Sequence, residues 1–224
     1  MKDTFPFDSD ALHGASDALK QVMSQLAVAV DLEPGDVLME KGDHGDTFYA
    51  IHTGSLEFSV ISSDGRKLSL DVMHKGAMFG EIALFDPGPR TATVTALKPT
   101  RVLGIKNADV IKALHKSPEL AIDMLRLAGQ RMRWMGVQLS EQVFLPLPAR
   151  LAKKVLHLTA HTDAEQPDLN LSQAELAEFA GASREAVSKT LSRWNRNGII
   201  SLTRGGLRLL DRDALQALAE INEI

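Results

Sequence analysis

The 224-residue chain contains no cysteine, and aromatic residues make up only 5% of it. The absence of cysteine excludes disulfides, zinc sites built on thiolates, cysteine-ligated iron–sulfur clusters and cysteine nucleophiles. No long hydrophobic run is present either, because the apolar stretch at 26–30 is far too short to cross a bilayer. Residues 1–30 lack the basic start and apolar stretch of a signal peptide. We therefore expect a cytoplasmic protein that has no membrane partner.

Neither sign of charge is in large excess, since 25 basic and 29 acidic residues give a net charge of −4. This average gives no reason to expect nucleic acid as a partner. The seven histidines are scattered, and no metal-ligand spacing or nucleophile motif is present. We therefore expect no enzyme activity, no metal and no cofactor. The length suits two domains, and an apolar content of 44% is enough for a buried core.

The hydrophobic pattern changes its period along the amino-terminal half. Residues 9–29 have helical spacing, whereas from Val30 to Lys106 short alternating runs lie between glycines. The runs at 56–60 and 68–72 have period two, which predicts strands with one face inward. Asp64-Gly65 between them predicts a tight hairpin turn. Many short strands with turn signals predict an antiparallel sandwich or barrel.

A short helix is predicted at 107–116, followed by a long one that starts at Ser117 and runs to about Gln142. Apolar residues at heptad spacing form a narrow seam along this long helix, and the other faces of the helix carry charged residues, Asp123 and Arg131 among them. This narrow heptad seam favours homodimerisation over the alternative that the helix packs only on its own sheet. Pro146 and Pro148 end the helix and predict a hinge at 145–148. The seam consists of Ala121, Leu125, Ala128, Met132, Met135 and Leu139.

Two short helices joined by a glycine turn are predicted after a helix at 149–158 and a polar loop at 161–170. Ser172 and Glu175 form a capping box, and Ser183 caps the second helix, predicted at 184–194. Apolar segments at 199–202 and 207–210 flank a turn and predict a wing, and Asp211 caps a last helix. This pattern predicts a winged helix-turn-helix. Six basic residues and one acidic residue between 184 and 208 suit contacts with DNA phosphates.

The segment at 181–187, Gly-Ala-Ser-Arg-Glu-Ala-Val, resembles the recognition-helix pattern G-x-S-R-E-x-V of the cyclic-AMP receptor (CRP/FNR) family. The resemblance implies that Arg184 and Glu185 read bases of a TGTGA-like half-site. Lys189 stands where the family usually has a second guanine-reading arginine; a lysine still donates to guanine but lacks the bidentate fork. The predicted DNA-binding residues are Ser172, Ser183, Arg184, Glu185, Ser188, Lys189, Arg193 and Arg204.

Residues 79–94, which we call the cassette, carry the most specific motif of the other half. Gly80 allows a ligand to approach the backbone, and Arg90 brings a fixed positive charge suited to a phosphate. A helical turn near Ile82 would offer free N–H groups to an anion, and Glu81 would accept from a sugar hydroxyl. A phosphate together with a sugar hydroxyl indicates a nucleotide.

The cassette also resembles the phosphate-binding cassette of cyclic-nucleotide-binding domains, FGE[LI]AL…PR[AT]A. The resemblance implies that Glu81 holds the ribose 2′-hydroxyl and that Arg90 and Thr91 hold the cyclic phosphate. Backbone contacts would come from Gly80, Ile82 and Ala83. The alternative is a jelly roll in which Glu81 and Arg90 form an ordinary ion pair with each other.

The base is expected to pack against Leu70 and the long helix near Met135. In the cyclic-AMP receptor a threonine–serine pair on that helix meets the adenine, and this chain has Met135 and Gly136 there. Thr91 can favour guanine in some relatives. Cyclic AMP is the expected ligand, and cyclic GMP is the other candidate.

The predicted fold is therefore α+β, with an antiparallel β jelly roll at 1–116, a dimerisation helix at 117–144 and a winged helix-turn-helix at 145–224. The resemblance implies a homodimeric, cyclic-nucleotide-responsive transcription regulator that binds a palindromic TGTGA-like site in double-stranded DNA and meets RNA polymerase. One alternative is a family regulator that senses another ligand or binds DNA constitutively. An alternative of another class is a cyclic-nucleotide-binding regulatory subunit that does not bind DNA.

Overall fold

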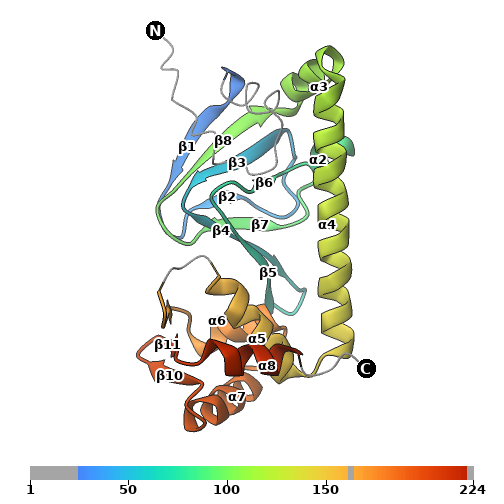
Figure 1. The fold of residues 1–224 in the computed structure, drawn as a ribbon. Helices are drawn as coiled ribbons and strands as arrows, with labels where there is room; N and C mark the ends of the chain where they lie inside the picture. Colours follow the sequence, from blue (N-terminus) through green and yellow to red (C-terminus); the bar gives the residue numbers. More distant parts are fainter. Residues whose placement is uncertain (1–24, 161–163, 221–224) are drawn as a thin grey trace. The chain divides into compact units, whose positions relative to one another are not determined.

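The computed structural model describes residues 25–160 and 164–220 (Figure 1). Its contacts divide the chain into two compact units, Met1–Val60 with Leu70–Trp134 and Ile61–Ser69 with Met135–Ile224. Most of the helix predicted at 9–29 lies outside the described residues. The end of that prediction is wrong, because the chain is already in strand β1 from Val28.

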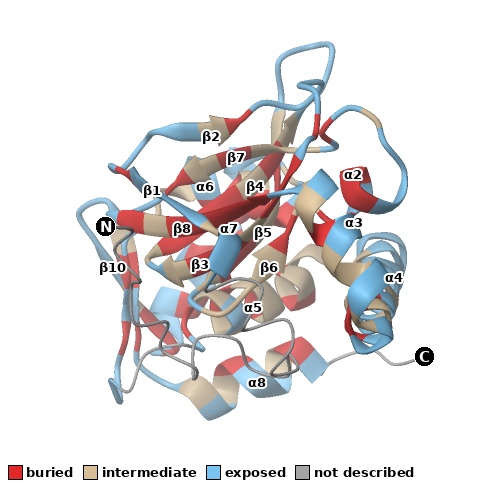
Figure 2. Ribbon diagram, turned by 90° about the horizontal axis from the view of Figure 1, so that it is seen from above, coloured by how far each residue is buried: buried red, intermediate tan, exposed pale blue. Residues whose placement is uncertain are grey.

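Antiparallel strands of the described chain pair into two four-stranded sheets, in the orders β1-β8-β3-β6 and β2-β7-β4-β5 (Figure 1). Apolar side chains of both sheets, such as Ile51, Leu56 and Val102, are fully buried and form one core cluster. The burial colouring of Figure 2 shows β3 and β8 mostly buried. The predicted jelly roll is confirmed. The strands are β1 (Val28–Leu32), β2 (Val37–Met39), β3 (Thr47–Thr53), β4 (Ser55–Ile61), β5 (Lys67–His74), β6 (Met78–Phe79), β7 (Thr93–Ala96) and β8 (Thr100–Lys106).

The hairpin between β4 and β5 turns at the predicted Asp64-Gly65 pair. Gly65 has a φ of 82°, which favours glycine, and the Ser62 N–H donates to the Arg66 carbonyl at 2.9 Å. The prediction that only one face of these strands points inward is wrong. Ser55, Glu57 and Ser59 of β4 are buried as well as Leu56. Both faces of strand β4 are therefore covered. Its polar and apolar residues alternate along the chain, but both kinds are buried.

The helices of the first half are α2 (Ile82–Phe85), α3 (Asn107–Lys116) and α4 (Pro118–Phe144). Leu120 and Met124 of α4 are buried in a second cluster with Leu84 of the cassette. Asp123 is buried as well, and Arg131 is half-buried, although both side chains are charged. The reason is helical spacing: Arg131 follows Met124 by seven residues and therefore lies on the same face.

The predicted heptad seam of α4 is open in the single chain. Leu125, Met132 and Leu139 are 65%, 70% and 68% exposed, although all three are large and apolar. Helix α4 packs on its own β domain through a different face, which carries Leu120 and Met124, and the seam stays open there.

The second unit contains a winged helix-turn-helix around a core that includes Leu151, Leu191 and Trp194. Two predictions need correction. Helix α5 begins at Leu147 rather than 149, because proline is tolerated in the first turn of a helix. The loop at 161–170 contains a two-residue strand, β9, that pairs with β11. The elements are α5 (Leu147–Leu158), β9 (Asp168–Leu169), α6 (Gln173–Ala180), α7 (Arg184–Arg196), β10 (Ile200–Thr203), β11 (Gly206–Leu209) and α8 (Arg212–Glu220).

Across the described ranges, 25–160 and 164–220, no helix combines the length and the apolar character that crossing a membrane requires.

Candidate functional site

The cassette brings its backbone close to strand β3 and to Arg90. Gly80 has a φ of 89°, and a Cβ there would lie 2.9 Å from both Arg90 Nη1 and the Thr47 carbonyl oxygen. Any larger residue at position 80 would therefore be strained and would also occupy the space in front of the guanidinium. Helix α2 follows directly, and its Leu84 packs with Leu120 and Met124 of α4.

Arg90 is held rigidly, and only 8% of it is exposed. Its Nη2 donates to the Thr47 carbonyl at 2.7 Å, and its guanidinium carbon lies 5.7 Å from the centre of the Tyr49 ring. Its backbone exchanges hydrogen bonds with the loop before β3, to Asp43 at 2.8 Å and from Gly42 at 2.9 Å. Among the described residues, Nη1 is buried without a hydrogen-bond acceptor. A buried cationic N–H of this kind is costly unless an acceptor is supplied, and an anion would supply it.

Glu81 is also buried, with 4% exposure, and its ion-pair partner is Arg131 of α4. Arg131 Nε lies 3.6 Å from Glu81 Oε1. The alternative that Glu81 and Arg90 simply pair with each other is therefore wrong for the described part of the chain. A carboxylate accepts several hydrogen bonds, so Glu81 keeps acceptor capacity for a sugar hydroxyl.

Arg131 links Glu81 to a second carboxylate that the sequence reasoning missed. Its Nη1 lies 3.9 Å from Asp71 Oδ2, and its Nη2 donates to Met73 Sδ at 2.9 Å and to the Met78 carbonyl at 3.1 Å. Two signals could have found these residues. Arg131 shares a helical face with buried Met124, and Asp71 shares a strand face with buried Met73.

The β2–β3 loop and the start of α3 brace the cassette. Asn107 Nδ2 donates to the carbonyls of Ala83 at 3.0 Å and Gly45 at 3.3 Å. Asp46 accepts from Lys106 Nζ at 2.7 Å and from Thr47 Oγ1 at 2.6 Å, and these bonds hold the pKa of Asp46 below its usual value. The cassette is thereby attached to the chain segment that leads into α4.

The structure brings five of the predicted ligand residues together in the first unit: Gly80, Glu81, Ile82, Ala83 and Arg90. Thr91 follows Arg90 and is exposed.

The three residues predicted to meet the base are placed differently. Leu70 is half-buried, and strand alternation puts it on the face of β5 opposite Asp71 and Met73. Met135 and Gly136 belong to the second unit, where Met135 is 49% exposed. Base contacts by all three stay predictions.

The helix-turn-helix of the second unit is capped as predicted. The Glu175 N–H donates to Ser172 Oγ at 3.2 Å, and the Ser172 N–H donates to Glu175 Oε2 at 2.7 Å. Gly181 ends α6 with a φ of 59°, and the Ala186 N–H donates to Ser183 Oγ at 3.3 Å. The caps fix where α7 starts and therefore where Arg184 projects.

Helix α7 buries one face and leaves the other polar. Val187, Leu191 and Trp194 are buried, as predicted. The predicted DNA-binding residues on or next to α7 are exposed or half-buried; they are Ser183, Arg184, Glu185, Ser188, Lys189 and Arg193.

The wing carries exposed Arg204 in its turn, whereas Arg208 is engaged elsewhere. Arg208 Nε and Nη2 donate to Asp168 of β9 at 2.8 and 3.0 Å, which raises the pKa of Arg208 and lowers that of Asp168. One of the six positive charges counted between 184 and 208 is therefore neutralised by Asp168.

A hollow of about 200 Å³ lies between the start of α6, the start of α7 and the wing. Backbone N–H groups at a helix start, together with an arginine, suit a phosphate oxygen. The hollow is lined by Ser172, Gln173, Ala174, Arg184, Leu202, Thr203, Gly205 and Gly206.

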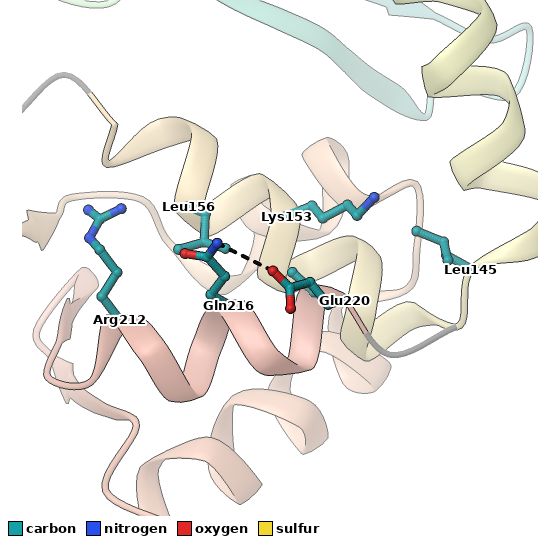
Figure 3. Close-up of a pocket in the computed structure, with 7 residues that line it drawn as sticks. Leu145, Lys153, Leu156, Arg212, Gln216 and Glu220 are labelled. Atoms are coloured by element: carbon teal, nitrogen blue, oxygen red, sulfur yellow. Dashed lines mark hydrogen bonds between the residues drawn. The ribbon is translucent and has the colours of Figure 1, made fainter. Parts of the chain in front are cut away.

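A larger hollow of about 770 Å³ lies between α5 and α8 (Figure 3). Its cationic side chains are already engaged: Lys153 pairs with Glu141 at 2.9 Å, and Arg212 Nη2 donates to the Thr159 carbonyl at 3.1 Å. Gln216 and Glu220 bond to each other on α8 (Figure 3). We assign no ligand to this hollow. Among the described residues no group of histidine and acidic side chains could hold a metal ion.

A jelly roll with a buried Glu–Arg cassette, followed in the chain by a long helix and a winged helix-turn-helix, defines a class of DNA-binding proteins that carry an additional β domain. Residues 29–117 match the cyclic nucleotide-binding domain family, and residues 149–218 match the Crp-like helix-turn-helix domain family. Within that class, the chain belongs to the CRP/FNR family and is a DNA-binding transcription regulator with a cyclic nucleotide-binding domain.

Three relatives illustrate this membership. A CRP-like cAMP-activated global transcriptional regulator of Mycobacterium tuberculosis is 31% identical over 191 residues, which cover 83% of this chain and 85% of that protein. The anaerobic regulatory protein of Bacillus subtilis is 25% identical over 222 residues, covering 96% and 92%. The crystal structure of a CRP/FNR-family regulator from Thermus thermophilus matches with a TM-score of 0.76 at 27% identity, covering 86% of this chain and 98% of that one.

Proposed function

We propose that the protein is a homodimeric transcription regulator whose affinity for a palindromic, TGTGA-like site in double-stranded DNA is controlled by a cyclic purine nucleotide. Arg90 and Thr91 bind the cyclic phosphate, and Glu81 accepts from the ribose 2′-hydroxyl. Contact with RNA polymerase at the promoter is part of the proposal.

The observation that carries this proposal is the buried Nη1 of Arg90. Its guanidinium is fixed by the Thr47 carbonyl and the Tyr49 ring, yet Nη1 meets no acceptor among the described residues. Gly80 leaves the space in front of it open to a phosphate oxygen. A charge-assisted hydrogen bond there would satisfy the buried cation.

The names of the relatives favour a nucleotide as the ligand but do not identify the ligand of this chain. The Mycobacterium tuberculosis relative is named as cAMP-activated, whereas the Bacillus subtilis relative is named as an anaerobic regulator. A family regulator with another ligand therefore stays the second candidate. The buried Glu81–Arg90 constellation favours a ligand with both a phosphate and a vicinal hydroxyl.

Packing in the first unit supports a route from the cassette to the dimer helix. Leu84 of α2 shares a core cluster with Leu120 and Met124 of α4, and Asn107 ties Ala83 to the start of α3. A ligand that moved α2 would therefore act directly on α4. A shift between two arrangements of α4 requires that the ligand bind one of them more tightly.

Replacing Arg90 tests ligand binding. We expect Arg90→Ala to weaken binding of cyclic nucleotides about 100-fold or more in calorimetry, because a buried charge-assisted contact is lost. Arg101→Ala is the matched control, since Arg101 lies in the same unit but pairs with exposed Asp31 at 2.6 Å. Equal affinities of the Arg90→Ala variant and the wild-type protein would contradict the assignment.

Charging the open seam of α4 tests dimerisation. We expect Met132→Glu to convert a dimer into monomers in sedimentation, because a like-charge pair would replace an apolar contact across the heptad seam. Gln130→Glu adds the same charge on an exposed position outside the seam and should leave the dimer intact. A wild-type monomer at micromolar concentration would contradict the proposed dimer.

A further inference from the structure

Two charged side chains from outside the cassette lie next to Glu81. Asp71 and Arg131 complete a cluster in which Arg131 lies 3.6 Å from Glu81 and 3.9 Å from Asp71. The side chains of Asp71, Arg131 and Glu81 are only 12%, 23% and 6% exposed. Holding three charges out of water in one place is unfavourable unless their polar atoms are used.

The cluster adjoins Glu81, the residue that would hold the ribose. In the proposed function Glu81 binds the ribose 2′-hydroxyl, and a base leaves the sugar at the adjacent carbon. Asp71 lies one guanidinium group away from Glu81, because Arg131 is 3.9 Å from the first carboxylate and 3.6 Å from the second. Asp71 also shares its strand face with Met73, which contacts Arg131 and belongs to the core.

We infer that Asp71, with Arg131 beside it, reads the base and selects guanine over adenine. This inference rests on the proposed function, because it takes the ligand to be a cyclic purine nucleotide. An ionised carboxylate only accepts hydrogen bonds, whereas a guanidinium only donates them. The pair therefore presents one donor group followed by two acceptor oxygens.

Guanine matches that order on its Watson–Crick edge. Its O6 accepts, and its N1–H and N2–H both donate, so all three groups find a partner. Adenine offers one donating amino group next to the N1 lone pair, which leaves the second carboxylate oxygen without a donor. A site built to accept two N–H groups discriminates against a base that supplies only one.

The hydrogen bond that Asp71 accepts from the backbone fits a role in binding the base. Its Oδ1 accepts from the Val72 N–H at 2.9 Å, which fixes the carboxylate on the strand. Each oxygen of a carboxylate has two lone pairs and can accept more than one hydrogen bond. The residues that the helix α4 offers at 135 and 136, a methionine and a glycine, have no hydrogen-bonding side chain for the base.

Calorimetry of the full-length protein with three cyclic nucleotides tests the inference. We expect the wild-type protein to bind cyclic GMP about ten-fold or more tightly than cyclic AMP, since one charge-assisted hydrogen bond separates them. Cyclic IMP, which keeps O6 and N1–H but lacks the amino group, should fall between the two.

The diagnostic variant is Asp71→Asn, because an amide presents one acceptor and one donor and so complements adenine. We expect it to weaken cyclic GMP binding and to abolish or reverse the preference. Asp31→Asn, on an exposed aspartate of β1, should change neither affinity.

Two results would overturn the inference: a wild-type preference for cyclic AMP, or an equal loss for both nucleotides in Asp71→Asn, which would make Asp71 a support for Arg131 only. If the wild-type protein binds no cyclic nucleotide at all, the proposed function itself is contradicted.

Discussion

In the cassette Glu81 and Arg90 are 4% and 8% exposed, whereas on helix α7 Arg184 and Lys189 are in solvent. The buried charges have fixed partners from distant segments, Arg131 for Glu81 and the Thr47 carbonyl for Arg90. The charges of α7 owe their position to the caps at its start. Under the proposed function, one site is thus preorganised for a single small anion, and the other meets an extended polyanion whose contacts form on docking.

Salt should separate the two sites most strongly. Exposed phosphate contacts release counterions, so a protein with 6–10 of them loses about 10³–10⁵ in DNA affinity between 50 and 200 mM salt. Buried charges are screened much less, so we expect the affinity for a cyclic nucleotide to change by less than about ten-fold. Fluorescence anisotropy for DNA and calorimetry for the nucleotide, in the same buffers, would measure both. A steep salt dependence of nucleotide binding would contradict the buried site.

Substitution of Arg184 should alter the specificity of DNA binding. We expect Arg184→Ala to cost about 1–3 kcal/mol at one base pair and to relax the preference there, as for an arginine that reads guanine. Arg204→Ala in the wing is the matched control, because a phosphate contact is lost equally on every sequence. Binding to a panel of single-base variants of the half-site would distinguish the two. A uniform loss for Arg184→Ala would make it a phosphate contact instead.

Removal of a cap should have the smallest effect. Ser172→Ala removes the Oγ that accepts from the Glu175 N–H at the start of α6 and leaves the backbone N–H of residue 172 free to donate to Glu175 Oε2. We expect it to lower the free energy of unfolding of the second unit by about 1 kcal/mol. Chemical denaturation would measure the change. Asp36→Ala removes a comparable side-chain acceptor, that of the Glu33 N–H at 2.8 Å, in the first unit and should leave that transition unaffected. An equal shift in both variants would contradict this explanation.

The contrast between the sites also explains how far the sequence could predict them. The recognition helix depends on local signals, and its caps, its turn glycine and its buried face were all read correctly from neighbouring residues. The cassette motif was equally readable. The jelly roll and the long helix followed from hydrophobic period.

Long-range partners were not readable from the sequence. Arg131 lies 50 residues from Glu81 in the chain, and only the packing of α4 on the β domain brings them together. Asp71 shows no motif, and β9 is a two-residue strand whose pairing with β11 joins Asp168 to Arg208. These contacts depend on tertiary structure, and they decide which charges stay available for a ligand or for DNA.

The central claim is that the buried cassette controls the exposed DNA-binding surface. It is tested most directly by measuring DNA affinity during titration with cyclic GMP and cyclic AMP, for the wild-type protein and for Arg90→Ala. We expect a nucleotide to raise the affinity of the wild-type protein for its palindromic site within the usual range of allosteric coupling, about 5–150-fold, and to leave the variant unchanged. Wild-type binding that is indifferent to both nucleotides would contradict the account.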